Sequence, residues 1–249
     1  MSAPRAAVPL YVHPVVDSAL WERVLRPGAA DLVVVNVDSG PGHTPDPVFA
    51  EALHARDHSA RDHSARDLGA RDHSAPATLL GYVDTDYGRR DVHDVRAEAR
   101  LWRDRYGVTS VFLDQVISGT GPDGRVDVDA LLFVTDLANA LRRDGVAMLA
   151  GNPGTVPHPR VLRLLDVTCV RETDLETHLT APAPPVPDVD PARLWHLIYD
   201  CPPERVRDAV ERSAELGAGF VGLAADGLPH PWGSVEYLNA DRPTISSAG

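Results

Sequence analysis

Lysine is absent from the 249 residues, and all 24 basic side chains are arginine. Schiff-base aldolases, pyridoxal-phosphate enzymes and Walker-type NTPases depend on a lysine amine, so the sequence excludes these classes. Cysteine is nearly absent too: Cys169 and Cys201 stand alone and have no CxxC spacing. A disulfide framework or a cysteine-ligated zinc site is therefore not indicated.

Positive charge is scarce, with 24 basic against 36 acidic residues and a net charge of −12. Such a field repels a phosphate backbone, so nucleic acid is not an expected partner. No run approaches the roughly 18 apolar residues of a membrane span, and no membrane partner is expected. Residues 1–9 lack the apolar core of a secretory signal. We expect a cytoplasmic monomer, or a secreted protein if the true start or the export route differs.

Short apolar runs rich in β-branched residues recur along the chain and alternate with segments of helical spacing. The predicted helices include 92–106, 128–142 and 203–216. The predicted strands are 9–14, 31–37, 78–83, 110–116, 146–151, 165–170, 194–199 and 219–224. Eight such units in about 250 residues predict an α/β fold, a closed (β/α)8 barrel of the TIM type, rather than an open doubly wound sheet. Residues 1–249 are expected to form this single domain.

A five-residue repeat, ARDHS, occupies residues 55–75 between the second and third predicted strands. Its histidines, His58, His63 and His73, suggest a metal site. However, a five-residue step turns the chain by about 140° around a helix, so the histidines would not share a face. The repeat is interpreted as a solvated low-complexity insertion, and neither a metal nor another cofactor is predicted.

Polar residues follow nearly every predicted strand, where a barrel of this type builds its site. Carboxylates and amides without clustered cations suit a neutral polyhydroxylated or cationic ligand, which favours carbohydrate as the partner. Turns and helix caps use the same residue types, so SGPG at 39–42 and NPGT at 152–155 are also read as shaped loops. His13 is either a general base or a structural residue. Asp114 follows the apolar run 111–113 directly, which predicts a place at the inner rim of the mouth.

Several segments share one family pattern: PLYVHP at 9–14, Asn36 with SGPG, GYVDTDYGRR at 81–90, FLD at 112–114, NPGT, Glu172, and PW at 231–232. Together they resemble spherulation-specific family 4, the spherulin-4-like proteins placed among glycoside hydrolases that act on galactosamine-containing polysaccharide. The resemblance implies a (β/α)8 barrel with endo-acting α-1,4-galactosaminidase activity. It makes Asp114 and Glu172 the catalytic candidates, and the substrate-binding candidates are Gln115, His13, Asn36, Tyr82, Asp84, Tyr87, Asn152 and Asp226.

Two positions depart from the family pattern. Gln115 stands where the family usually has glutamate, and Arg171 precedes Glu172 where the family often has phenylalanine. Glycoside hydrolysis needs two carboxyl groups, and an amide replaces neither. Either Asp114 and Glu172 are the working pair while Gln115 orients substrate, or the protein is a catalytically impaired carbohydrate-binding barrel. A different barrel enzyme, such as a metal-dependent hydrolase or lyase, is the third alternative.

Overall fold

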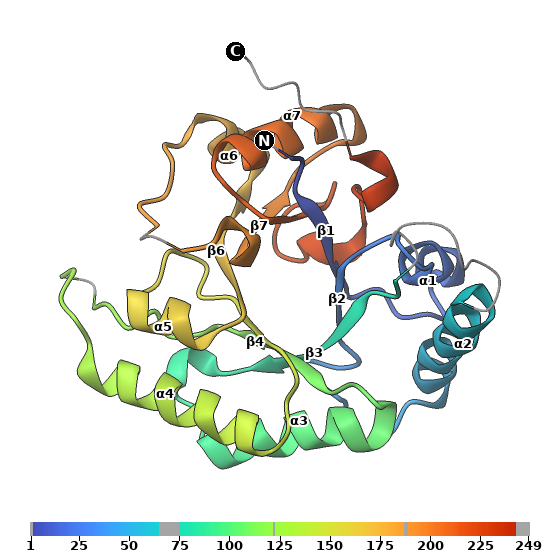
Figure 1. The fold of residues 1–249 in the computed structure, drawn as a ribbon, viewed down its shortest axis with the longest axis horizontal. Helices are drawn as coiled ribbons and strands as arrows, with labels where there is room; N and C mark the ends of the chain where they lie inside the picture. The colour runs from blue at the N-terminus through green and yellow to red at the C-terminus, as the bar shows by residue number, and fades with distance from the viewer. Residues whose placement is uncertain (1, 65–74, 122, 187–188, 243–249) are drawn as a thin grey trace.

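The computed structural model describes residues 2–64, 75–121, 123–186 and 189–242. Eight parallel strands follow one another around a closed barrel, and helices surround the ring of strands (Figure 1). The predicted (β/α)8 barrel is confirmed. The elements are β1 (Arg5–Leu10), α1 (Ser18–Leu25), β2 (Leu32–Val35), α2 (Pro47–Ser64), β3 (Thr78–Asp84), α3 (Val92–Tyr106), β4 (Ser110–Asp114), α4 (Val128–Arg143), β5 (Leu149–Gly151), α5 (Pro159–Leu164), β6 (Val167–Asp174), α6 (Leu175–Thr180), β7 (Leu194–Tyr199), α7 (Val206–Glu215) and β8 (Phe220–Leu223).

The strands separate two apolar cores because alternate side chains face opposite sides of the barrel wall. Leu80, Phe112 and Trp195 belong to the core inside the barrel. Val111 and Leu113, the neighbours of Phe112 along β4, belong to the larger core between the wall and the helices. The interior is thus filled with side chains, and only the strand ends are left to form a site.

Helix α3 shows how the sequence sets an element. The Asp91 carboxylate caps its first turn by accepting a hydrogen bond from the backbone N–H of His93, and Gly107 ends it in the left-handed conformation. Trp102, on the buried face of α3, lies so close to Gly81 of β3 that a Cβ there would come within 2.4 Å of the indole. Gly81 is therefore required for the packing of α3 on β3. The predicted range 92–106 matches the observed bounds of α3.

Several elements differ from prediction. Strands β2 and β4 are shorter than the predicted 31–37 and 110–116, and β6 extends four residues beyond the predicted 165–170. Strand β1 begins at Arg5, four residues early, because closure pairs Arg5 with Phe220 of β8. Strand β5 is only Leu149–Gly151. Within the described residues, two 3₁₀ turns, η4 (Pro231–Gly233) and η5 (Asn239–Asp241), follow β8 where an eighth helix would stand.

The segment after η4 closes the seam between the two ends of the chain. Asn239 accepts a hydrogen bond from the backbone N–H of Ala6 at 2.9 Å, and the Tyr237 hydroxyl donates to the Pro4 carbonyl at 2.7 Å. The first and last parts of the described chain are thereby bound to each other.

Helix α2 carries the start of the ARDHS repeat, as far as Ser64. The side chains of residues 56–64 and the whole of residues 65–74 lie outside what the structure describes, so the rest of the insertion stays a prediction. No helix in the described part of the chain is long and apolar enough to cross a membrane.

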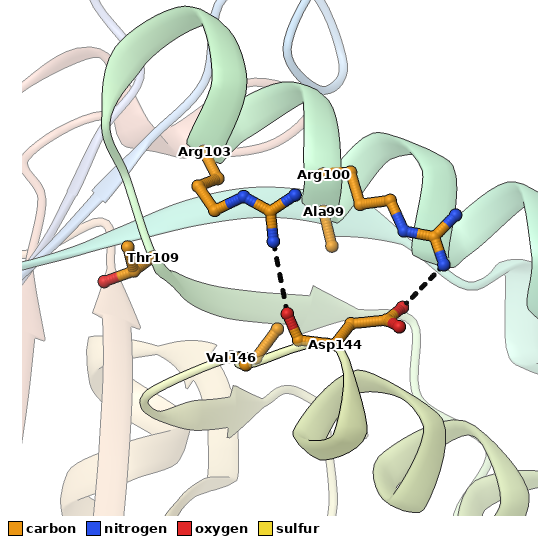
Figure 2. Close-up of a pocket in the computed structure, with 7 residues that line it drawn as sticks. Ala99, Arg100, Arg103, Thr109, Asp144 and Val146 are labelled. Atoms are coloured by element: carbon orange, nitrogen blue, oxygen red, sulfur yellow. Dashed lines mark hydrogen bonds and ion pairs between the residues drawn. The ribbon is translucent and has the colours of Figure 1, made fainter.

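The end of the barrel opposite the mouth is held by arginines of α3 around Asp144, as Figure 2 shows for Arg100 and Arg103. Arg96 and Arg100 reach the carboxylate at 2.8 and 3.0 Å, and Arg103 donates to the Asp144 backbone carbonyl at 3.1 Å. The first of these contacts, to Arg96, does most to lower the pKa of Asp144 to about 2. The cavity here measures about 10 Å³, room for about one water, so this cluster joins α3 to the C-terminal end of α4 rather than forming a ligand site.

Candidate active site

Alternation along the strands carries polar side chains from the barrel interior to its mouth. Phe112 and Ala150 lie in the interior core. Two residues further along each strand direction come Asp114, at the end of β4, and Asn152, directly after β5. Tyr82 of β3 lies beside Phe112 in register and reaches the same space. These side chains therefore converge because period-two geometry leaves them on the inner face.

The position of Glu172 depends on a β-bulge in β6 rather than on regular alternation. Cys169 lies in the interior core, so strict alternation would place Arg171 inside. The register with β7 shifts between Cys169 and Arg171, and Arg171 instead pairs with His196. A bulge adds one residue to the strand and reverses which side chains face inward beyond it. Glu172 consequently faces the mouth.

Asn152 joins the two carboxylates. Its Nδ2 atom donates to Asp114 Oδ1 at 3.0 Å and to Glu172 Oε2 at 2.6 Å, while its Oδ1 accepts from the Gly154 backbone N–H at 2.9 Å. The Tyr82 hydroxyl donates to Asp114 Oδ2 at 2.9 Å. The arrangement places two carboxyl groups side by side with their donors fixed.

Burial raises the pKa of Asp114, and the hydrogen bonds from Tyr82, from the Gln115 backbone and from Asn152 oppose this rise. Burial also raises the pKa of Glu172, and the neighbouring Asp114 charge adds to the rise while hydrogen bonds from Asn152 and Trp232 oppose it. The pKa of Tyr82 is raised first by burial and then by the Asp114 charge, so its phenol stays protonated and donates. The two carboxyl groups thus have unequal support for a negative charge.

The turn after β3 supports the backbone at Asp114 and Gln115. The Thr85 hydroxyl donates to the carbonyls of both residues, at 3.1 and 2.8 Å, and the Tyr87 backbone N–H donates to the Gln115 carbonyl at 2.8 Å. Gln115 has a φ of 51°, which is uncommon for a residue with a side chain. Its backbone N–H hydrogen-bonds the Asp114 carboxylate. Gln115 therefore stabilises the charged Asp114 carboxylate through its backbone rather than through its side chain.

Other predicted site residues have contacts of their own. The His13 ring lies 3.1 Å from the Asp46 carboxylate at the start of α2, which fits the structural alternative. The Asn36 side-chain oxygen accepts from the Gly40 backbone N–H at 2.8 Å and shapes the loop at 39–42. Arg105 of α3 fixes the same loop by donating to the Gly42 carbonyl at 2.6 Å. The SGPG segment is thus a shaped loop.

The remaining three predicted residues lie at the mouth end: Asp84 is the last residue of β3, and Tyr87 and Asp226 follow β3 and β8. Asp84 pairs in register with Asp114, and its carboxylate accepts from the Asp86 backbone N–H at 2.7 Å. Tyr87 is 51% exposed, and Asp226 is exposed as well. Among the described residues, no group of three or more His, Cys, Asp or Glu side chains is arranged to hold a metal ion.

The family model of spherulation-specific family 4 matches residues 5–234. The chain belongs to this family. A curated relative within it, Spherulin-4 of Physarum polycephalum, is 26% identical over 156 residues, which make up 60% of this chain and 39% of that protein. The matched region is thus less than half of the relative's length.

Solved structures also match this spherulation-specific family 4 chain. The crystal structure of Aspergillus clavatus Sph3 in complex with GalNAc has a TM-score of 0.67 and 21% sequence identity. The match covers 94% of this chain and 93% of that chain. At this identity the likeness shows a shared fold, the (β/α)8 barrel.

Two residues of this family 4 site were not predicted as site residues. The Tyr11 ring stands edge-on to Tyr82 with centroids 5.7 Å apart, and burial followed by the Asp114 charge raises its pKa well above the usual value. Trp232, in η4, hydrogen-bonds Glu172. Alternation from Ala7 along β1 could have indicated Tyr11. A 3₁₀ turn has no such periodicity, so only the PW segment of the resemblance indicated Trp232.

Proposed function

We propose that this protein is a retaining glycoside hydrolase that cleaves α-1,4-linked galactosamine or N-acetylgalactosamine polysaccharide within the chain. The observation that carries the proposal is the pair Asp114 and Glu172, held side by side by Asn152 at the mouth of the barrel. Membership of spherulation-specific family 4 supports it, and so does the GalNAc named in the Sph3 structure.

The spacing of the two carboxylates supports retention of configuration. Oxygens at 3.0 and 2.6 Å from one nitrogen lie at most about 5.6 Å apart. Retaining enzymes hold their carboxyl groups roughly 5–5.5 Å apart, whereas inverting enzymes need about 6.5–9.5 Å to admit a water molecule. The pair is therefore close enough for one carboxylate to attack the sugar while the other protonates the leaving oxygen.

Hydrogen bonding divides the two roles. Asp114 accepts from Tyr82, Asn152 and the Gln115 backbone, so its negative charge is the better supported. Glu172 has fewer donors and faces the Asp114 charge, which keeps its proton bound to higher pH. Asp114 then attacks the anomeric carbon while Glu172 gives its proton to the departing oxygen. In the second step Glu172 takes a proton from water, which displaces Asp114 and restores both groups.

The binding-only alternative depends on Gln115. Its backbone N–H and carbonyl are both engaged in holding the Asp114 segment, and these contacts do not require a carboxylate in the side chain. A complete pair is present without residue 115, which favours hydrolysis.

The first test measures product release from an α-1,4-galactosamine polysaccharide by mass spectrometry, for the wild type, Asp114→Asn and Gln115→Glu. We expect oligosaccharides from the wild type and a loss of about 10³-fold or more in Asp114→Asn, because the nucleophile is gone. Proton NMR of the first product should show the α-anomer. Cleavage by Gln115→Glu alone would establish the binding-only alternative, and a β-anomer would contradict the retaining assignment.

A further inference from the structure

A group of buried basic side chains lies outside the mouth, where α6 packs on β6, β7 and α7 (Figure 1). Six buried side-chain nitrogen atoms of the described residues have no hydrogen-bond partner, and five of them belong to this group. They are Arg171 Nη1, Arg212 Nε, His178 Nδ1 and both ring nitrogens of His196. These four residues are called the basic cluster below. None of them has a part in the proposed hydrolysis.

The two histidine rings form the centre of the basic cluster. His178 of α6 and His196 of β7 are both 0% exposed, and their ring centroids lie 5.5 Å apart. His178 Nε2 lies 3.3 Å from the Ala209 carbonyl oxygen of α7 and 3.1 Å from the Ser213 hydroxyl oxygen. A carbonyl only accepts, so Nε2 carries the proton of the neutral His178 ring. Nδ1 is then the atom that binds a second proton.

The two arginines of the basic cluster hold the chain just after α6. Arg171 of β6 donates to the Pro182 carbonyl at 2.7 Å, and Arg212 of α7 donates to the Ala181 carbonyl at 2.9 Å. These carbonyls are successive in the chain, and the two guanidinium groups lie close enough for each charge to lower the pKa of His178. Because α6 has only six residues, its stability depends on such contacts with its neighbours.

The positive charge of the basic cluster is not balanced beside the rings. The ion pairs found among the described residues leave Arg171 without a carboxylate partner. The carboxylates of β6, α6 and α7 have other contacts: Glu172 with Asn152, Asp174 with the Thr177 backbone, Glu176 and Asp208 with Arg205, Glu211 with Arg207, and Glu215 with Nη1 of Arg212. The charges that act on the rings are therefore those of the two arginines and of the rings themselves.

Burial gives both rings a low proton affinity. Burial lowers the pKa of His178 to about 4, with smaller contributions from Arg171 and Arg212 and against the hydrogen bond to Ala209. Burial, followed by His178 and Arg171, lowers the pKa of His196 to about 3. A solvent-exposed histidine has a pKa near 6.5. As the pH falls from about 6.5 toward the folded values, a state with exposed rings binds protons that the packed state does not, so the packed state loses stability.

We propose that the basic cluster is an acid-sensitive latch, which holds α6 against α7 while both rings are neutral and releases α6 and residues 181–182 when the rings bind protons. A proton on His178 Nδ1 adds a third positive charge beside two guanidinium groups in a buried space, where like charges repel strongly. Strand β6 passes directly into α6, so release also loosens the strand end that carries Glu172. The effect of this loosening on cleavage rests on the proposed function, whereas the release itself does not.

Hydrogen–deuterium exchange of the whole chain, read by mass spectrometry at pH 7 and pH 4.5 and corrected for the intrinsic rate at each pH, tests the latch. Protection of the α6 amides should fall by about 100-fold or more at pH 4.5, while protection of α3 falls less. His196→Phe removes one titrating ring without removing a hydrogen bond, and it should make the fall in α6 about tenfold smaller. His178→Gln keeps a donor for the Ala209 carbonyl and should have the same effect.

His93→Phe is the matched control, because the His93 side chain on α3 is 77% exposed, and it should respond to pH as the wild type does. An equal fall in α3 and α6 of the wild type would mean that the whole barrel opens, and would overturn the latch. A fall in α6 that is the same in the wild type, His196→Phe and His178→Gln would overturn it too. The wild-type comparison decides even where a variant does not fold. No substrate enters the measurement, so the latch and the proposed hydrolysis fail or stand separately.

Discussion

Asn152 is the residue on which the site depends most directly. It is buried, and one amide serves both carboxylates while its oxygen is fixed by the backbone of Gly154. A side chain with no donor at this position would leave two neighbouring carboxyl groups with less compensation for their burial. The pKa values of the two carboxyl groups would then rise, because Asn152 stabilises their charged forms.

Asn152→Ala should therefore lower kcat/KM by about 10²-fold and move the acidic limb of the pH–rate profile to higher pH. The acidic limb moves to higher pH because the variant loses a hydrogen bond that lowers the pKa of Asp114 and of Glu172. The measurement is a pH–rate profile on the polysaccharide. Asn139→Ala, on the exposed face of α4, serves as the control and should match the wild type. An unshifted acidic limb would argue against the shared-donor role.

Strand β6 marks the boundary of what the sequence predicts at the scale of elements. Period-two alternation places Asp114 and Asn152 correctly from the apolar runs before them. The same rule, applied from Cys169, faces Arg171 inward and Glu172 outward, and the bulge reverses both. The local residue types do not predict the extra residue of the bulge, because the bulge depends on how β6 pairs with β7. Glu172 was thus predicted through family resemblance, while the barrel itself followed from the repeated strand and helix patterns.

The contact of α3 with Asp144 belongs to this scale as well. Asp144→Asn should reduce the free energy of unfolding by about 1 kcal/mol at pH 7 and leave activity unchanged. Because the folded pKa is lowered to about 2, the stabilisation is present above the unfolded value near 4 and is lost as pH falls through 2. Urea unfolding at pH 7 and pH 2 measures this. Asp136→Asn, on the exposed face of α4, is the control, and an equal difference at both pH values would contradict the ion-pair account.

At the scale of the whole molecule, two pairs of carboxylates have opposite effects on stability. Asp144 and Asp46 have lowered pKa values, owing chiefly to Arg96 and to the Phe49 backbone N–H respectively, so they stabilise the fold at neutral pH. Asp114 and Glu172 have raised pKa values, owing chiefly to burial, and a raised folded pKa gives stability that is lost as pH rises through it. Ionisation of these two buried carboxyl groups therefore lowers the stability of the fold.

Glu172→Gln should raise Tm at pH 7, by about 2–4 °C for each kcal/mol of relieved burial, and abolish cleavage. The gain should shrink toward pH 4, where the wild-type carboxyl binds its proton. Calorimetric scans at the two pH values give the comparison, with Glu176→Gln on α6 as an exposed control. A lower Tm at pH 7 would show that the hydrogen bonds lost with the carboxylate outweigh the burial of its charge.

The seam between Asn239 and Ala6 has a consequence for how the chain reaches its native state. Strand β1 is synthesised first but gains its β8 neighbour, and the bonds from Tyr237 and Asn239, only after more than 200 residues have followed. Until then one edge of β1 is unpaired and open to other chains. Contacts of such long sequence separation slow folding, so ring closure is expected to be a late event. The same proximity of residues 4–6 to residues 237–239 makes these segments natural places to join in a circular permutant, which would convert the most distant contact of the barrel into a local one.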